Sequence, residues 1–413
     1  MVNRQRLLER FLRYVQVDTT AVEGSASYPS SGGQLELGAR VARELQELGL
    51  SDVLQDEHGI VTATIPSTTE RASPVIAFNA HFDTSPETTG ADVKPQVIED
   101  YPGGDLILPN AAEKVIRVAD NPELTELVGC TLVTTDGTTL LGGDDKAGIA
   151  VILELATWLT ENPQVGHGAI RILFTCDEEI GRGVEFVDLE KLAATVCYTL
   201  DGPGANQIDV ETFSADLATV NVRGINIHPS IAKNRMVNAI RAAGQFIDGL
   251  PRDMAPENTA ERLGFLHPYQ IQGGVDQVTL KIILRDFETP ALEKQAELLR
   301  RVAAAVEEQF AGCQISVQTR AQYRNMRQGL SREPGAVQFA ELAHQRLDRK
   351  AKITIIRGGT DGSQLTERGL PTPNLSTGQH NPHSPLEWVC LDEMVQAVEV
   401  LVELVQIWAV KEE

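Results

Sequence analysis

The chain has 413 residues, which is long enough for two domains, and its 42% hydrophobic content is typical of a soluble globular protein. Its 58 acidic residues outnumber its 36 basic residues, for a formal net charge of −22. This excess argues against a nucleic-acid partner, because phosphate binding needs a basic face. No run approaches the roughly 18 uninterrupted apolar residues of a membrane span, so no membrane partner is predicted.

The N-terminal segment and the cysteines predict a cytoplasmic location. Arginine and leucine alternate at the start of the chain, without the apolar core and cleavage site of a secretory signal. The five cysteines are scattered and form no Cys-x-x-Cys pair. We therefore expect a reducing compartment, and we do not expect cysteine to bind metal.

The first part of the chain alternates helical and strand-like patterns. Helical spacing covers 4–17, 33–48 and, with a strongly amphipathic pattern, 147–159. Apolar or β-rich runs followed by turn residues cover 75–80, 170–175 and 195–200. Such alternation predicts an α/β fold with a mostly parallel, mixed sheet flanked by helices.

The pattern changes near residue 212 and changes back near 325. Between these points we expect strands at 217–222, 277–286 and 315–319, and helices at 234–247 and 292–310. The last part has helices at 336–347 and 392–410, with strands at 353–356 and 373–376. The sequence thus predicts a catalytic domain made of 1–211 and 326–413, with an inserted α+β lid domain at 212–325.

Five acidic or histidine-bearing segments follow strand-like runs. They are HFDT at 81–84, GDDK at 143–146, DEE at 177–179, LDG at 200–202 and NPHS at 381–384. Reactive groups of an open α/β sheet collect beyond the carboxyl ends of its strands. We therefore expect these segments to meet in one crevice.

Histidine and aspartate in the first two segments suit a metal site, although each also has a simpler explanation. His81 and Asp83 point to the same side of an extended chain, so Asp83 can orient a metal-binding imidazole. A hydrogen-bonded loop pair is the alternative. Asp144 can bridge two metals, whereas Asp145 can equally be a helix N-cap. The glycines before them permit an abrupt turn.

Adjacent glutamates after the run 170–175 are the strongest local signal. Like charges at a strand end are costly unless cations neutralise them. One carboxylate can bind metal while its neighbour handles a proton, so we assign Glu179 as ligand and Glu178 as general base. A charged surface loop is the alternative. Asp201 and His383 complete the set, and His380 competes with His383 for the last ligand position.

The charges of these groups balance two divalent cations. Asp144, Glu179 and Asp201 offset three of the four positive charges, and a bridging hydroxide offsets the fourth. Carboxylates with neutral imidazoles and no thiolate suit Zn²⁺, with Mn²⁺ or Co²⁺ as substitutes. Paired metals of this kind activate water for hydrolysis.

Several of these motifs occur together and in order in a known family. The matching segments are 81–86, 140–148, 177–181, 228–229, 236–239, 285–287 and 357–362. On them the chain resembles, nearly end to end, the tripeptide aminopeptidases of the M20 metallopeptidase family. One departure is Ser230, where the family often has glycine after the His-Pro pair.

The resemblance implies a role for each residue. It implies one zinc bound by His81, Asp144 and Asp201, and another bound by Asp144, Glu179 and His383. It implies that Glu178 deprotonates a metal-bridging water, that Asp83 orients His81 and that His228 stabilises the oxyanion. Asn238, Arg285 and Arg357 are implied to bind substrate.

We accordingly expect an enzyme that removes the N-terminal residue from tripeptides and acts as a monomer or a homodimer. Arg285 or Arg357 would pair with the peptide carboxylate. The alternatives are another M20-type hydrolase (a dipeptidase, a carboxypeptidase or an N-acyl-amino-acid deacylase) and a non-catalytic peptide- or metal-binding relative. A pure binder has no need of the unligated Glu178.

Overall fold

The computed structural model describes residues 1–410, and the chain forms two compact units. The first unit contains 1–210, 326–355 and the chain from 360 onward; the second contains 211–325 and 356–359. The catalytic domain predicted from the sequence included 356–359, which this division places in the second unit. The segment joins the second unit because Phe213 N–H donates to Ile356 O (3.2 Å) and Arg357 donates to the carbonyl oxygen of Leu263 (3.0 Å).

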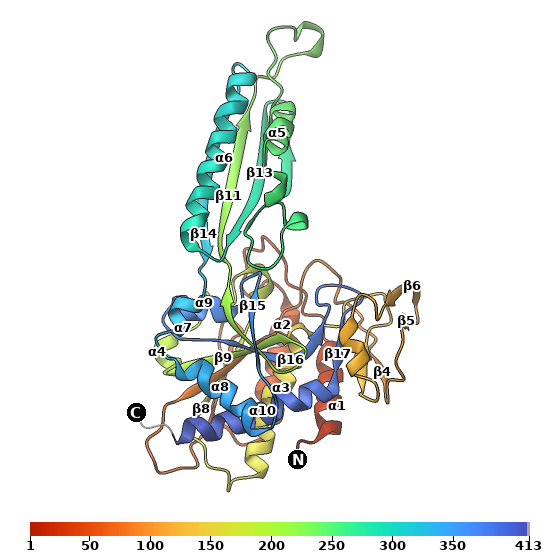
Figure 1. Cartoon of the computed structure of the whole chain (residues 1–413), viewed down its shortest axis with the longest axis vertical. Coiled ribbons are helices and arrows are strands. Elements are labelled where there is room, and N and C mark those ends of the chain that lie inside the picture. The colour runs from red at the N-terminus through yellow and green to blue at the C-terminus, as the bar shows by residue number, and fades with distance from the viewer. Residues whose placement is uncertain (411–413) are drawn as a thin grey trace. The chain divides into compact units, whose positions relative to one another are not determined.

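A large mixed sheet is the framework of the first unit. Its strands follow the order β1-β2-β8-β3-β9-β16-β17-β7-β4, with β10 and β15 attached beside β16 (Figure 1). They are β1 (Ser51–Gln55), β2 (Val61–Ile65), β3 (Ile76–His81), β4 (Gln96–Ile98), β7 (Leu132–Thr134), β8 (Ile170–Thr175), β9 (Val196–Pro203), β10 (Gln207–Thr212), β15 (Lys352–Ile356), β16 (Asn374–His380) and β17 (Trp388–Cys390). The strands β8, β3, β9 and β16 are parallel to one another, and the flanking pairs are antiparallel. A separate hairpin joins β5 (Leu106–Leu108) to β6 (Ala111–Ile116).

Helices pack on this sheet. They are α1 (Arg4–Val15), α2 (Gly32–Glu47), α3 (Gly143–Glu161), α4 (Leu189–Leu192), α7 (Arg327–Leu330), α8 (Gly335–Arg346), α9 (Asp361–Glu367) and α10 (Leu391–Ala409). The helix predicted at 147–159 forms within α3, but it is not amphipathic, because α3 is buried on nearly every side. Glu154 is itself buried and pairs with Arg6 and Arg10 of α1. A helix that is apolar all round belongs in a core.

The second unit is a four-stranded antiparallel sheet with two helices packed on it (Figure 1). The strand order is β12-β13-β11-β14, and the elements are β11 (Ser214–Arg223), α5 (Ala239–Asp248), β12 (Phe265–Gly273), β13 (Gln277–Asp286), α6 (Thr289–Gln309) and β14 (Gln314–Tyr323). Ala218, Val220 and Val222 alternate inward from β11 toward the helices, as period-two burial requires. The helix predicted from residue 234 begins at Ala239, because Asn238 caps it.

Within residues 1–410, none of the helices combines the length and apolarity needed to cross a membrane.

Candidate active site

The predicted metal ligands of the first unit converge at the carboxyl ends of its parallel strands. His81 is the last residue of β3, and Asp201 lies in the last part of β9. Glu179 belongs to a single 3₁₀ turn (Glu178–Ile180) that begins three residues after β8. Asp144 stands at the entrance to α3, and His383 follows β16. The sheet therefore brings together residues that are far apart in the sequence.

Two groups of possible ligand atoms share Asp144. In the first, His81 Nε2 lies 3.0 Å from Asp144 Oδ1 and 3.9 Å from Asp201 Oδ1. In the second, His383 Nε2 lies 3.3 Å from Asp144 Oδ2 and 2.9 Å from Glu179 Oε2. Within each group, the ligand atoms all lie within 4.8 Å of one another. Because each oxygen of Asp144 faces a different histidine, its carboxylate can bridge two cations.

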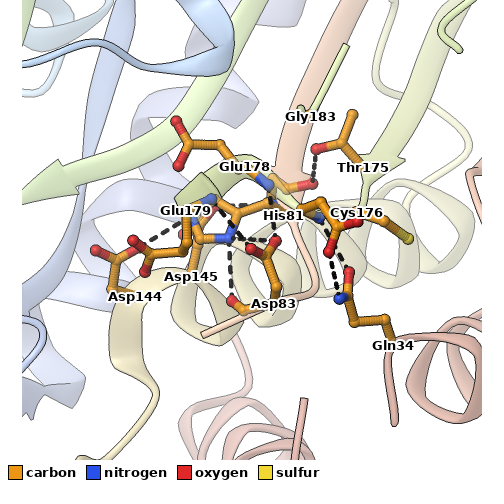
Figure 2. Close-up of polar contacts among 12 residues, drawn as sticks. Gln34, His81, Asp83, Asp144, Asp145, Thr175, Cys176, Glu178, Glu179 and Gly183 are labelled. Atoms are coloured by element: carbon orange, nitrogen blue, oxygen red, sulfur yellow. Dashed lines mark hydrogen bonds and ion pairs between the residues drawn. The ribbon is translucent and has the colours of Figure 1, made fainter. Parts of the chain in front are cut away.

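Asp83 holds both His81 and the glutamate turn. Its carboxylate and its carbonyl oxygen lie 3.4 Å and 3.1 Å from His81 Nδ1. The two carboxylate oxygens also accept the backbone N–H groups of Glu178 and Glu179, each at 3.0 Å (Figure 2). Asp83 thus fixes which ring nitrogen of His81 faces the site and where the glutamate turn lies.

Asp145 turns away from the ligand groups and stabilises local backbone. Its Oδ1 accepts Gly148 N–H (3.2 Å) inside α3, and its Oδ2 accepts His81 N–H (3.2 Å). The helix-capping alternative therefore describes Asp145, whereas Asp144 faces the histidines. The peptide bond between the two aspartates is cis.

The electrostatics of the site disfavour so many buried negative charges. Burial raises the pKa of Glu179 to about 7, and nearby Asp144 adds to the shift. Burial, and then Asp144, also raise the pKa of Asp201 well above its usual range. Burial lowers the pKa of His383, but Asp144 and Glu179 outweigh it and raise that pKa to about 12. The two carboxylates and His383 therefore bind protons more strongly than usual without metal, and a bound metal would replace those protons.

The residues also fit a metal by their unused atoms. His81 Nε2 and Asp144 Oδ1 are buried and lie 3.0 Å apart without the geometry of a hydrogen bond, and Glu179 Oε1 is buried with no hydrogen-bond partner within the described residues. Buried polar atoms of a folded protein are normally hydrogen-bonded, so this cluster has donor atoms left for another partner. Imidazole and carboxylate donors without thiolate suit Zn²⁺ and similar divalent ions.

Comparison with known proteins identifies the family. A model of peptidase family M20/M25/M40 matches residues 134–407. A peptidase T from Geobacillus sp. (strain WCH70) is 41% identical over 408 residues, which cover 99% of this chain and 100% of that protein. The chain belongs to peptidase family M20/M25/M40. The predicted family resemblance is confirmed, and this M20 peptidase is a metallopeptidase.

Solved structures share the fold of the M20 peptidase. A tripeptidase from Staphylococcus aureus matches with a TM-score of 0.78 and 24% identity, over 100% of both chains. A dinuclear metal-binding M20 peptidase from Bacillus subtilis matches with a TM-score of 0.64 and 18% identity, over 98% of both chains. These likenesses confirm the predicted α/β class with a mixed sheet flanked by helices.

His380 does not join the ligand groups of the M20 peptidase. Its Nε2 lies 2.7 Å from Glu393 Oε2, and its ring stacks on Trp388 at 3.7 Å between centroids. His383 is 36% exposed by side chain, and its Nε2 faces Asp144 and Glu179. Of the two competing histidines, only His383 faces the carboxylates.

Sequence reasoning missed the residues that hold the turn before the two glutamates. Asp177 has φ 62°, in the left-handed region, and it is fully buried. Its carboxylate accepts Ser30 N–H (2.7 Å) and Gln34 Nε2 (2.7 Å), while its own N–H donates to Gln34 Oε1 (3.0 Å). Gln34 therefore holds both the side chain and the backbone of Asp177. No local signal marks a residue 143 positions away in the chain.

The proposed substrate residues lie in the second unit. The side chain of Asn238 accepts Ile240 N–H (2.9 Å) as the N-cap of α5. Arg285 lies over the Tyr323 ring and donates from Nη1 to the carbonyl of Arg357 (3.4 Å). His228 Nδ1 accepts the backbone N–H of Ser230 (3.3 Å) and lies 2.7 Å from its hydroxyl.

Proposed function

We propose that the protein is a cytoplasmic two-zinc aminopeptidase that removes the N-terminal residue from tripeptides. The sharing of Asp144 between two ligand groups carries the two-metal part of the proposal. The tripeptide part draws on relatives named peptidase T and on the fold shared with a tripeptidase. All five cysteines are free thiols, which suits a reducing compartment.

His81, Asp144 and Asp201 would hold one zinc ion, and Asp144, Glu179 and His383 the other. Bound in this way, zinc supplies Lewis acidity, which lowers the pKa of water and polarises the peptide carbonyl. The Bacillus subtilis M20 peptidase of the same fold is a dinuclear metal-binding peptidase. Mn²⁺ or Co²⁺ would fit the same donors.

Glu178 is the proposed general base. It stands beside Glu179, its backbone N–H is fixed by Asp83, and it belongs to neither ligand group. Burial raises the pKa of Glu178 well above its usual range, and the charges of Asp361 and Asp201 add to the shift. Such a carboxylate accepts a proton from the attacking water and returns it to the departing amine.

His228 is the proposed donor to the oxyanion. Because its Nδ1 accepts the N–H of Ser230, the neutral ring carries its proton on Nε2, which remains free to donate. The backbone N–H of Ser230, which a glycine at this position would also supply, therefore favours the tautomer that this role needs. A donor of this kind contributes roughly 3 kcal/mol in a dry site.

Of the two arginines, Arg285 is the better candidate for the substrate carboxylate. Arg285 Nε is buried and has no hydrogen-bond partner among the described residues. Arg357 is already committed: it donates to Glu261 O (2.7 Å), Leu263 O (3.0 Å) and Thr259 Oγ1 (2.9 Å). We propose that Arg285 measures peptide length by pairing with the C-terminal carboxylate.

The test of the proton-transfer role is Glu178→Gln in protein loaded with zinc. We expect kcat to fall by about 10²- to 10⁴-fold while both metals stay bound, because the residue is a base and not a ligand. The control is Glu185→Gln. Glu185 is exposed and pairs with Arg182, three residues before it in the chain. Loss of a metal in Glu178→Gln would assign the residue to the ligands instead.

A peptide panel tests the substrate. Di-, tri- and tetrapeptides, N-acetylated tripeptides and C-terminally amidated tripeptides are incubated with the enzyme, and the products are identified by mass spectrometry. We expect release of the first residue from free tripeptides, and from amidated tripeptides at a higher KM, but not from di-, tetra- or N-acetylated peptides. Release of the last residue, cleavage of dipeptides, or removal of the acetyl group would point to a carboxypeptidase, a dipeptidase or a deacylase.

The arginine proposal has its own test. Arg285→Met should raise KM for tripeptides by about 10- to 100-fold, the value of one charge-assisted pair, with little change for amidated tripeptides. Arg357→Met is the matched comparison and should not distinguish the two substrates. Equal effects of Arg285→Met on both substrates would remove Arg285 from carboxylate recognition.

A further inference from the structure

Glu387 is a buried carboxylate that the proposed chemistry does not use. It lies four residues after His383 and directly before β17, and it is 1% exposed. Within the described residues no lysine or arginine forms an ion pair with its side chain, although the buried ammonium of Lys146 is near enough to interact with it electrostatically. A buried carboxylate needs compensating partners, so its hydrogen bonds indicate what it does.

Those hydrogen bonds all go to one turn. Glu387 Oε2 accepts Leu141 N–H (2.7 Å) and Gly142 N–H (2.8 Å), and Glu387 Oε1 accepts Asp144 N–H (3.0 Å). The third donor is the backbone of the residue whose carboxylate both ligand groups share. One side chain therefore fixes the backbone that carries Asp144.

The turn and the Glu387 side chain are fitted closely together. A Cβ on Gly143 would lie 2.6 Å from Val389 Cγ2 and 3.1 Å from Glu387 Oε1. Gly142 has φ 82°, which favours glycine. The turn thus follows the surface formed by 387–389, and it has little room to shift.

Glu387 also belongs to the chain segment that carries His383. That segment is held at its other end, since Thr88 Oγ1 donates to His383 O (2.7 Å) and Glu387 N–H donates to Ser384 O (3.1 Å). Asp144 and His383 come from segments more than 200 residues apart, and Glu387 joins them. The Glu387 carboxylate therefore ties the backbone of Asp144 to the chain segment that carries His383.

The first ligand group is supported differently. His81 ends β3 and Asp201 lies in β9, two strands that are paired in the centre of the sheet. Only Asp144 connects this group to Glu387. Loss of the Glu387 hydrogen bonds should therefore disturb the first group less than the second.

We propose that Glu387 is a positioning residue that aligns Asp144 with His383. This alignment strengthens metal binding by the second ligand group more than by the first. The inference rests on the two-metal function proposed above. It requires both oxygens of the side chain, one for the Leu141 and Gly142 N–H groups and one for Asp144 N–H. The role is exerted through the backbone of Asp144 and not through contact with substrate.

The experiment is zinc binding to metal-free Glu387→Gln, followed by competition with a chromophoric chelator. A glutamine side chain has a single acceptor oxygen, and its amide group would face N–H donors. We expect one zinc to bind with an affinity close to that of the wild type and the other to bind about 10- to 100-fold more weakly, as is usual when a partner of a metal ligand is removed.

Two further variants separate positioning from folding. Glu393→Gln is the matched control, a buried glutamate in the neighbouring helix α10 that bonds His380 and no proposed ligand; it should leave both zinc affinities unchanged. His383→Ala removes the second group directly, so adding Glu387→Gln to it should weaken zinc binding little further.

Each outcome decides the matter. If the wild type does not bind two zinc ions, the proposed function fails; if it does and Glu387→Gln binds both as tightly, or loses both equally, only the positioning role is overturned. Glu387→Asp, which keeps the charge but is too short for all three N–H groups, replaces Glu387→Gln should that variant not fold. If neither variant folds, Glu387 serves folding itself and the positioning role is also overturned.

Discussion

Two clusters of buried carboxylates in the first unit are compensated in different ways. Glu154, on α3, is fully buried and pairs with Arg6 (2.7 Å) and Arg10 (3.0 Å) from α1. In the proposed active site, the ion-pair partners found for Asp144, Glu179 and Asp201 within residues 1–410 are histidines alone. One cluster carries its own permanent cations, whereas the other does not.

This difference distinguishes a structural charge cluster from a site prepared for ligands. An arginine remains protonated at any physiological pH, so the pairs of Glu154 are complete in the protein alone. Histidine is neutral when it binds metal, and it then leaves the carboxylates uncompensated. The candidate active site therefore has no permanent cation among its described ion-pair partners to balance its carboxylates, whereas the Glu154 cluster has two.

Metal removal should have the largest effect. Exhaustive treatment with a chelator should abolish peptidase activity, by more than about 10³-fold, and zinc should restore it. Since metal binds only the folded state, zinc at 1,000 times its dissociation constant should add about 4 kcal/mol to the free energy of unfolding. Activity assays and thermal unfolding with and without zinc measure both. Full activity in the chelated protein would show that the candidate site does not need metal.

Glu154→Gln should lower stability strongly without affecting metal. The substitution leaves the buried Arg10 guanidinium without its charged partner on α3, which costs about 3–5 kcal/mol of unfolding free energy. Denaturant unfolding of the metal-free protein measures this loss, and zinc affinity at low temperature should equal that of the wild type. If the free energy of unfolding falls by less than about 1 kcal/mol, Glu44, the other partner of Arg10, is enough to balance the charge of Arg10.

Asp201→Asn should have the opposite sign in metal-free protein. It removes one of several buried like charges, and two unit charges about 4 Å apart repel by roughly 1 kcal/mol even in water. We therefore expect the metal-free variant to be more stable than the wild type, although it binds zinc more weakly. Gln379 Nε2 donates to Asp201 Oδ1 (3.1 Å), a hydrogen bond that the asparagine oxygen can retain, so a destabilised metal-free variant would contradict the predicted repulsion.

Arg6→Met should have the smallest effect. The Arg6 side chain is 25% exposed, and Arg10 still pairs with Glu154 when Arg6 is removed. Partly exposed ion pairs contribute about 1 kcal/mol or less, so the free energy of unfolding should fall by no more than that. Denaturant unfolding in high salt provides the check, because screening should reduce the difference further.

Sequence patterns predicted that the candidate ligands converge, because these residues stand at or just after the ends of strands. An apolar run followed by an acid or a histidine marks the carboxyl end of a buried strand, as at His81 and Glu179. The carboxyl ends of neighbouring parallel strands must lie at one edge of the sheet. The convergence of the ligands could therefore be predicted without knowing any individual side-chain contact.

Other features depended on contacts between distant segments. Gln34 and Asp177 are 143 residues apart, and Glu387 and Asp144 are 243 apart. Such hydrogen bonds leave no periodic signal in either segment. The burial of Glu154 likewise depends on a distant segment, because Arg6 and Arg10 of α1 are its charged partners.

The sequence by itself determined the family, the α/β class and the kinds of donor atoms that the site contains. These follow from local hydrophobic patterns and from motifs whose order is fixed along the chain. Only the tertiary structure decided that His383 and not His380 faces the carboxylates, that Arg357 is occupied by carbonyl groups while Arg285 Nε is not, and that Glu387 holds the turn of Asp144. The physical reason is that a side chain's role depends on which polar partners remain unused after folding, and only packing determines that.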